Sequence, residues 1–135
     1  MTPAKSIQEV HQIIKNLPSM ASLKPEEYAE LNGYADIVAK EGNVKPTQMR
    51  KIFHYIKALK REFDRSEQNF NRAKVALVMP ALAYAKGRGH IPENFYDLLV
   101  LCFGAQKCKS IEDFEAAVNF LEAIMAYHKY HHPKE

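Results

Sequence analysis

Residues 45–63 read KPTQMRKIFHYIKALKREF, and the apolar residues among them recur at steps of three and four. This spacing places them on one side of an α-helix, because a helix turns once in about 3.6 residues. Lys45-Pro46 marks the beginning of the segment, and Thr47 offers a side chain suited to capping it. The stretch therefore predicts an amphipathic helix that packs through Met49, Ile52, Phe53, Ile56, Leu59 and Phe63.

The opposite side of the same helix carries cations. Four side chains fall within about 60° of one another and form a row about 16 Å long. Acidic residues nearby occur only at the C-terminal end of the segment, so most of the row lacks an intrahelical partner. Like charges in such a row repel one another, and this cost is easier to accommodate if an anionic partner neutralises them. A solvated helix face remains the alternative interpretation. The row consists of Arg50, His54, Lys57 and Arg61, and Arg65 extends it.

The charge of the whole chain is concentrated around this helix. Residues 45–90 contain 11 Lys and Arg against 3 Asp and Glu, a balance of +8. The segments before and after carry balances of −2 and −3, which leaves the net charge of +3. A basic middle third between two mildly acidic flanks indicates an anionic partner on one surface, without saying which anion.

Helical spacing recurs along the rest of the chain, and the alternation typical of strands is absent. We expect an all-α protein, a single compact bundle of five to six helices that forms a single helical domain over residues 1–135. Gly33 is expected to bend or split the second helix, and Pro80 to kink or restart the fourth, the expected central core helix. The expected segments are 7–17, 25–42, 47–63, 69–86, 92–104 and one that opens with the capping box SIED at 110–113.

Residues 83–90, AYAKGRGH, stop the fourth helix on a glycine-basic run. They lack the preceding strand and the glycine spacing of a nucleotide-binding loop, so a nucleoside-triphosphate site is not expected. Gly87 or Gly89 is suited to end the helix in the left-handed conformation, and Lys86 and Arg88 suit the negative end of the helix dipole. A second phosphate contact through these two cations is equally compatible with the local sequence.

Features of an enzyme are weak in this sequence. No Ser/His/Asp or Cys/His arrangement has a recognisable motif, and we predict no catalytic residue. His128, His131 and His132 have the spacing of metal ligands, but no acidic residue or cysteine completes the set. We interpret them as a polar terminal turn, and we predict neither a metal site nor a cofactor.

The two cysteines and the apolar runs bear on the compartment. Cys102 and Cys108 have a spacing that is not a zinc signature, and Cys102 falls in an apolar helix pattern typical of an inert buried thiol. The apolar runs are too short to span a bilayer, and the N-terminal residues lack an apolar signal core. We therefore expect an intracellular, cytoplasmic protein without membrane contact.

Three stretches together resemble a known family. KPTQMRKIFHYIKAL (45–59), LAYAKGRG (82–89) and FLEAIMAYHKYH (120–131) resemble, in this order, segments of the small subunit of the type III-A CRISPR–Csm interference complex, part of a CRISPR-Cas antiviral defence system. The resemblance covers residues 27–131. Each motif is modest alone, and the three in the right order are specific.

The resemblance implies a small, all-helical, non-catalytic RNA-binding protein. Several copies would stack head to tail as a filament beside other Csm effector subunits, and would contact the target RNA backbone in the guide–target duplex. Carried over from the motifs, the RNA-binding residues would be Arg50, Lys51, Lys86 and Arg88, while Lys57 and Arg61 enter through the helical row.

Another class of function remains open. The basic helix could instead meet acidic surfaces of neighbouring subunits, which would make the chain a structural assembly protein without direct RNA contact. The acidic flanks make head-to-tail self-association compatible with both interpretations.

Overall fold

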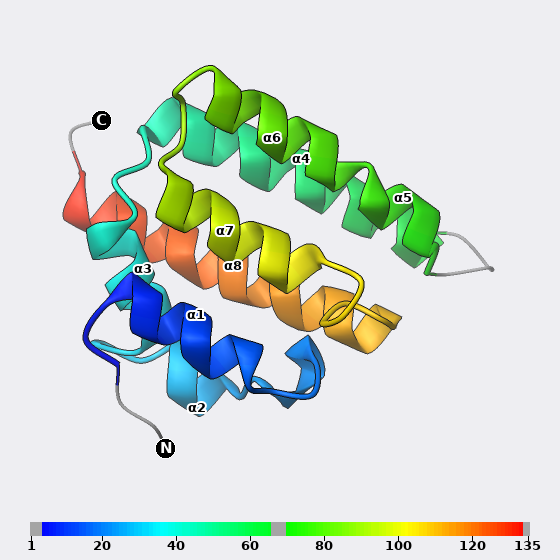
Figure 1. Cartoon of the computed structure of the whole chain (residues 1–135), viewed down its shortest axis with the longest axis horizontal. Coiled ribbons are helices and arrows are strands. Elements are labelled where there is room, and N and C mark those ends of the chain that lie inside the picture. Colours follow the sequence, from blue (N-terminus) through cyan, green and yellow to red (C-terminus); the bar gives the residue numbers. More distant parts are fainter. Residues whose placement is uncertain (1–3, 66–69, 134–135) are drawn as a thin grey trace.

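The computed structural model describes residues 4–65 and 70–133, which fold into helices joined by short loops (Figure 1). The prediction of an all-α fold is confirmed. The number of helices exceeds the expected five to six, because two of the expected helices are each divided in two. The elements of the described residues are α1 (Ile7–Lys15), the 3₁₀ helix η1 (Met20–Ser22), α2 (Pro25–Tyr28), α3 (Tyr34–Glu41), α4 (Pro46–Arg65), α5 (Arg72–Ala76), α6 (Val78–Gly87), α7 (Glu93–Phe103) and α8 (Ile111–His131).

The first division falls at Gly33, as the sequence predicts. A Cβ atom at this position would lie 2.8 Å from the Glu30 carbonyl oxygen and 2.9 Å from that of Glu27. Those distances are shorter than real Cβ contacts, so only glycine fits where the chain leaves α2 and turns into α3. The preceding Asn32 has a positive φ of 64°, a conformation that asparagine tolerates better than most residues.

The second division lies just before Pro80. Helix α5 ends at Ala76 and α6 begins at Val78, which places Pro80 in the first turn of α6. A proline there costs no hydrogen bond, because the first turn of a helix has unpaired N–H groups in any case. The prediction that Pro80 marks a restart is therefore confirmed.

The central helix is α8, and the prediction that residues 69–86 form it is wrong. The buried side chains of α8 follow one face along the whole length of the helix, which contacts α3, α4, η1 and α7. In the α5–α6 segment, by contrast, Leu77 and Tyr84 are 61% and 65% exposed. Both segments are rich in apolar residues, but α8 packs against more of the other elements than α5 and α6 do. The buried residues of α8 are Asp113, Phe114, Ala117, Val118, Phe120, Leu121, Ile124 and His128.

The helices lie in three levels in Figure 1, with α4 and α6 at the top, α7 and α8 in the middle, and α1 and α2 below. Helix α7 contacts both α1 and α6, and α4 packs on α8. The buried side chains of the described residues form one core cluster. That residues 1–135 form a single domain stays a prediction. None of the described helices is long and apolar enough to cross a membrane.

A buried lysine fastens the N-terminal segment to the core. Lys107 is 8% exposed, and its Nζ donates hydrogen bonds to the carbonyl oxygens of Lys15, at 2.7 Å, and Leu17. The Met20 N–H donates in return to the Lys107 carbonyl oxygen, at 2.9 Å. The Lys15 and Leu17 carbonyls lie at the C-terminal end of α1, where a cation such as the Lys107 ammonium also interacts favourably with the helix dipole.

Both cysteines are buried, so the interpretation of Cys102 as a buried thiol is confirmed. Burial raises the pKa of the Cys108 thiol to about 12, and it raises that of Cys102 still further. Since the thiolate is the reactive form, we expect a thiol reagent at pH 8 to modify neither residue within minutes. The same reagent should titrate both thiols at once in urea. Fast labelling of the folded protein would contradict this arrangement.

Candidate nucleic-acid interface

Helix α4 presents the cations that the sequence singled out. It is a continuous helix of 20 residues that begins at Pro46, one residue before the expected cap at Thr47. The Met49 N–H donates to the Lys45 carbonyl oxygen at 2.9 Å, so Thr47 lies inside the first turn. The side that packs on the core is defined by the buried residues Met49, Ile56, Leu59 and Phe63.

An outer row of cations runs along the opposite side of α4. Arg50, His54 and Arg61 are all exposed and lie roughly half a helical turn away from the buried side. None of the three takes part in an ion pair among the described residues. We call these three residues the outer row. The structure thus brings together Arg50 and Arg61, two of the six predicted RNA-binding residues, on one open helix face.

Lys57 lies at the edge of this row. Its side chain is 30% exposed, and its Nζ is 3.8 Å from a carboxylate oxygen of Glu122 on α8. The Nζ also lies 5.9 Å from the centroid of the Phe53 ring. Lys57 is therefore partly neutralised by the protein itself, unlike the outer row.

Acidic partners gather at the C-terminal end of α4, as the sequence predicts. Lys60 forms an ion pair with Asp64 at 3.0 Å, and Glu62 pairs with Lys74 of α5. Because these carboxylates pair with Lys60 and Lys74, they leave the outer row unpaired. Exposed ion pairs of this kind contribute little to stability, about 0–1 kcal/mol each.

The AYAKGRGH stretch ends α6 in a Schellman motif. Gly89 has a positive φ of 76°, its N–H donates to the Lys86 carbonyl at 2.9 Å, and the His90 N–H donates to the Ala85 carbonyl at 2.9 Å. The interpretation as a helix C-cap is confirmed, with Gly89 and not Gly87 as the left-handed residue. A phosphate contact by this turn stays a prediction.

The two cations of this turn point to different surfaces. The Lys86 Nζ lies 3.5 Å from a carboxylate oxygen of Glu93 and 5.1 Å from the centroid of the Tyr96 ring, so Lys86 faces α7. The Arg88 Nη1 instead donates a hydrogen bond to the Tyr84 hydroxyl at 2.9 Å, and the guanidinium lies over the Tyr84 ring. Lys86 therefore lies apart from the other predicted residues.

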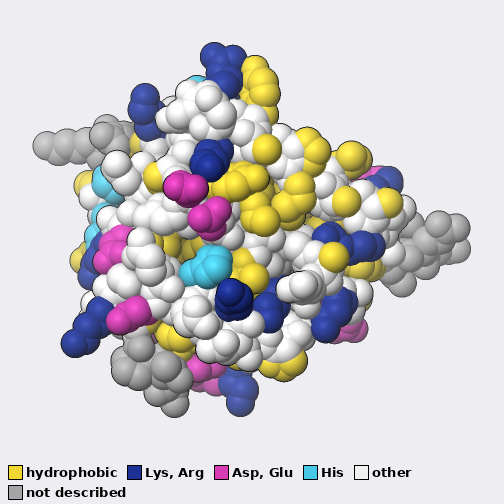
Figure 2. Space-filling model, in the orientation of Figure 1, with side chains coloured by type: hydrophobic (Ala, Val, Ile, Leu, Met, Phe, Trp, Pro, Cys, Tyr) yellow, Lys and Arg dark blue, Asp and Glu magenta, His cyan; other side chains and the backbone are white. Residues whose placement is uncertain are grey.

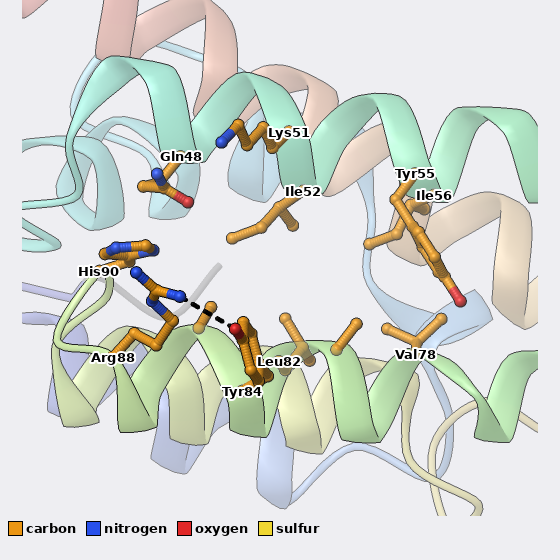
Figure 3. A pocket seen from close by; sticks show the side chains of 12 residues that line it. Gln48, Lys51, Ile52, Tyr55, Ile56, Val78, Leu82, Tyr84, Arg88 and His90 are labelled. Carbon is orange, nitrogen blue, oxygen red and sulfur yellow. Dashed lines mark hydrogen bonds between the residues drawn. The ribbon is translucent and has the colours of Figure 1, made fainter.

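A cleft of about 410 Å³ separates α4 from α6 (Figure 3). Lys51 reaches toward it from α4 and Arg88 from the end of α6, so the structure brings these two predicted residues to one site. No carboxylate occurs among the residues that line the cleft. One end is polar, with Gln48, Lys51, Arg88 and His90, and the rest is formed by Ile52, Tyr55, Ile56, Val78, Ala81, Leu82, Tyr84 and Ala85.

The α4–α6 cleft is not predicted by the sequence. Figure 2 shows hydrophobic side chains gathered on the surface at the α6 side of the molecule. They would be buried if this segment were the central core helix that the sequence predicts. The signal available in the sequence was the pair of tyrosines, Tyr55 and Tyr84, which fall beside cations on their helices. In the structure they are 46% and 65% exposed at the cleft.

The C-terminal histidines have structural partners. The Nε2 atom of buried His128 lies 2.6 Å from the Val44 carbonyl oxygen, and that of His131 lies 2.6 Å from Oδ1 of Asp36. These contacts tie α8 to α3 and to the segment after it. Within residues 4–65 and 70–133, no group of three His, Cys, Asp or Glu side chains is placed to hold a metal ion.

Asp36 ionises readily although it is 2% exposed. Burial raises the pKa of this carboxyl, but the Asn32 N–H, the His131 imidazole and the Lys40 ammonium outweigh that effect. Its pKa therefore lies below the ordinary value. The charged carboxylate holds the end of α8 and the turn before α3 together.

Fold and surface define a small all-helical protein with one basic helix face and one apolar cleft whose end is cationic. The chain matches the family model described as Csm2 Type III-A over residues 25–134, and it belongs to that family. The protein is thus a small subunit of the Csm effector complex of type III-A CRISPR-Cas systems, as the motifs indicate.

The match includes α2 to α8 and leaves out α1 and η1. Comparison with curated proteins and with solved structures gives no significant match.

Proposed function

We propose that this Csm subunit is a non-catalytic RNA-binding protein that stacks in a filament and contacts the phosphate backbone of target RNA in the guide–target duplex. The observation that carries the proposal is the outer row of α4. It offers arginines on an open face without a carboxylate partner among the described residues, in a chain of the Csm2 Type III-A family.

Backbone contact fits the chemistry of this row. Arg50 and Arg61 are about 16 Å apart along the helix, at a rise of about 1.5 Å per residue. A nucleic-acid strand carries phosphates every few ångströms, so such a row can meet several of them. Phosphate contacts are independent of sequence, and in an RNA-guided complex the guide supplies the sequence recognition by base pairing.

The six predicted residues contribute unequally in this proposal. Arg50 and Arg61 are the main contacts, and Lys57 is a weaker one because Glu122 lies beside it. RNA contact by Lys51, Lys86 and Arg88 stays a prediction. Because Lys86 faces Glu93, and Lys51 and Arg88 face the α4–α6 cleft, we expect these three residues to contribute less to RNA affinity than Arg50 and Arg61 do.

Reversing both arginines, Arg50→Glu with Arg61→Glu, should weaken target-RNA capture by the assembled effector about tenfold or more. The slope of log affinity against log salt should fall by about two, since each phosphate contact contributes about one. Filter binding over a salt series measures both quantities. Circular dichroism should show the helical fold unchanged, because both side chains are exposed.

The matched control is Lys15→Glu with Lys24→Glu, which changes the net charge equally at two exposed positions outside α4. This control should leave the affinity and the salt slope nearly unchanged. If both double variants behave alike, only net charge matters and the interface assignment is wrong. If the α4 variant loses RNA capture only because it fails to join the complex, the row binds a neighbouring subunit instead.

A further inference from the structure

The turn of residues 29–33, between α2 and α3, presents one large apolar side chain to solvent. Leu31 is 69% exposed, the highest value among the large hydrophobic side chains of the described residues. We call residues 29–33 the Leu31 turn. An exposed leucine is ordinary by itself. What distinguishes this one is how firmly its turn is held.

Hydrogen bonds on both sides of Leu31 fix the turn. The Asn32 N–H donates to Oδ2 of buried Asp36 at 2.8 Å, and the Tyr127 hydroxyl of α8 donates to the Ala29 carbonyl at 2.6 Å. The Gly33 N–H closes the turn on the Glu30 carbonyl at 2.8 Å. The backbone that presents Leu31 is thus preorganised, which lowers the entropic cost of docking it.

Three glutamates lie close to this apolar tip in the chain, and one lysine reaches the turn, since the Lys40 Nζ donates to Oδ1 of Asn32 at 3.4 Å. Glu26 and Glu30 are exposed and Glu27 is half-buried, all within five residues of Leu31 in the chain. The Leu31 turn therefore combines an apolar projection with neighbours that are more acidic than basic.

The α4–α6 cleft has the complementary character. Its walls are mostly aliphatic, its end carries Lys51 and Arg88, and no carboxylate lines it. Its volume of about 410 Å³ is more than one leucine side chain requires. In Figure 3 the guanidinium of Arg88 points into the cleft rather than away from it. An occupant with an apolar tip and acidic neighbours would match both the lining and the charge.

We propose that the Leu31 turn of one copy docks into the α4–α6 cleft of the next copy. This contact would join successive copies in the filament, so the inference rests on the filament of the proposed function. Two different surfaces meet, so the contact is heterologous and can continue from copy to copy. Figure 1 places α2 at the lower edge of the molecule and α4 and α6 at the upper edge, as an open-ended stack requires.

This assignment gives the cleft cations a role apart from RNA. Lys51 and Arg88 meet the glutamates of the neighbouring turn, while Arg50 and Arg61 remain open along the outer side of α4. One projecting side chain and a few ion pairs bury little area, so the contact is weak between isolated chains. Alignment of the copies within the effector complex raises their effective concentration and favours it.

Cysteine crosslinking tests the contact directly, because the native thiols are buried and unreactive. One chain carries Ala29→Cys, at an exposed position of the Leu31 turn that leaves Leu31 itself in place, and a second carries Ala81→Cys, at an exposed position in the cleft. A short bis-maleimide linker should join a mixture of the two into dimers, and should join a chain with both substitutions into a ladder. The reaction is run on the concentrated isolated protein and on the assembled effector.

The control replaces Ala29→Cys by Ala105→Cys, which is also an exposed alanine but lies in the loop after α7. It should give severalfold less product with Ala81→Cys. The proposal is overturned if the two pairs react equally, if no Ala29–Ala81 product forms in either preparation, or if Ala81→Cys links instead to another subunit.

The crosslinking outcome is separate from RNA binding. A chain with Arg50→Glu and Arg61→Glu should retain the Ala29–Ala81 product in the isolated protein, where no RNA is present. Loss of RNA capture with retained crosslinking supports both proposals. Normal RNA capture by that variant with retained crosslinking overturns the RNA interface alone.

Discussion

Replacing Asp113 with alanine should lower the free energy of unfolding by about 3 kcal/mol, measured by urea denaturation at pH 7. Asp113 is 3% exposed, and its carboxylate accepts the Ala21 N–H and the Lys109 N–H, both at 2.9 Å. It thereby joins η1 to the beginning of α8. The alanine variant leaves both N–H groups without these acceptors in a partly buried place, which is the costly outcome.

The same carboxylate makes stability depend on pH. Burial raises the pKa of Asp113, but hydrogen bonds from the Ala21 and Lys109 N–H groups and from two serine hydroxyls outweigh it, so the pKa lies below its ordinary value. Its stabilisation is therefore complete above about pH 4, the unfolded value, and is lost as the pH falls through the folded pKa. The stability difference between the native chain and Asp113→Asn should narrow as the pH falls from 6 to 3.

Glu112→Ala is the matched control, since Glu112 is in the same first turn of α8 but exposed. It removes the same favourable interaction with the helix dipole, about 0.3–1 kcal/mol, and no buried hydrogen bond. Equal losses in Glu112→Ala and Asp113→Ala would show that the dipole accounts for the whole effect.

The roles at this helix end show what the sequence predicts and what it does not. The SIED motif predicts an N-terminus, and the Ser110 hydroxyl indeed accepts the Asp113 N–H at 3.2 Å. The Asp113 carboxylate, however, leaves the local motif and binds Ala21, 92 residues away in the chain. Local spacing specifies a cap, but the partner of its carboxylate depends on which segment packs there.

The same distinction applies to the candidate site. Positions on α4 follow from the helical period, so the exposed row of Arg50 and Arg61 agrees with the sequence analysis. The α4–α6 cleft depends on how far apart two helices stand, which no single-helix period determines. The different directions of Lys86 and Arg88 depend likewise on Glu93 and Tyr84 as partners.

The apolar composition of the α5–α6 segment led to the wrong prediction of which helix is central. Residues 70–86 are apolar on several sides, yet much of that surface borders the α4–α6 cleft or solvent. An apolar helix face must be covered in the working protein, but the cover can come from another molecule. This is the physical reason for treating the exposed side of α6 as an interface.

Replacing Phe114 with alanine should cost about 3–5 kcal/mol, the largest loss expected for one substitution here. Phe114 is fully buried where α8 meets α4 and α7. Its ring centroid lies 5.2 Å from that of Phe63, 6.0 Å from that of Phe103 and 6.3 Å from that of Phe70. Loss of the ring leaves a cavity and removes edge-to-face contacts with Phe63 and Phe103. Thermal unfolding followed by circular dichroism should show a melting temperature lower by about 10–20 °C.

The control Phe114→Leu keeps most of the volume and should cost only about 1–2 kcal/mol, through the lost aromatic contacts. Because Phe63 is the last buried residue of α4, the alanine variant loosens the end of that helix, whereas Met49 and Ile56 still anchor its beginning. Well below its melting temperature the alanine variant should therefore retain most of its RNA capture through Arg50. Equal losses of stability in the two variants would show that the aromatic cluster has relaxed around the site, so that cavity formation does not control stability there.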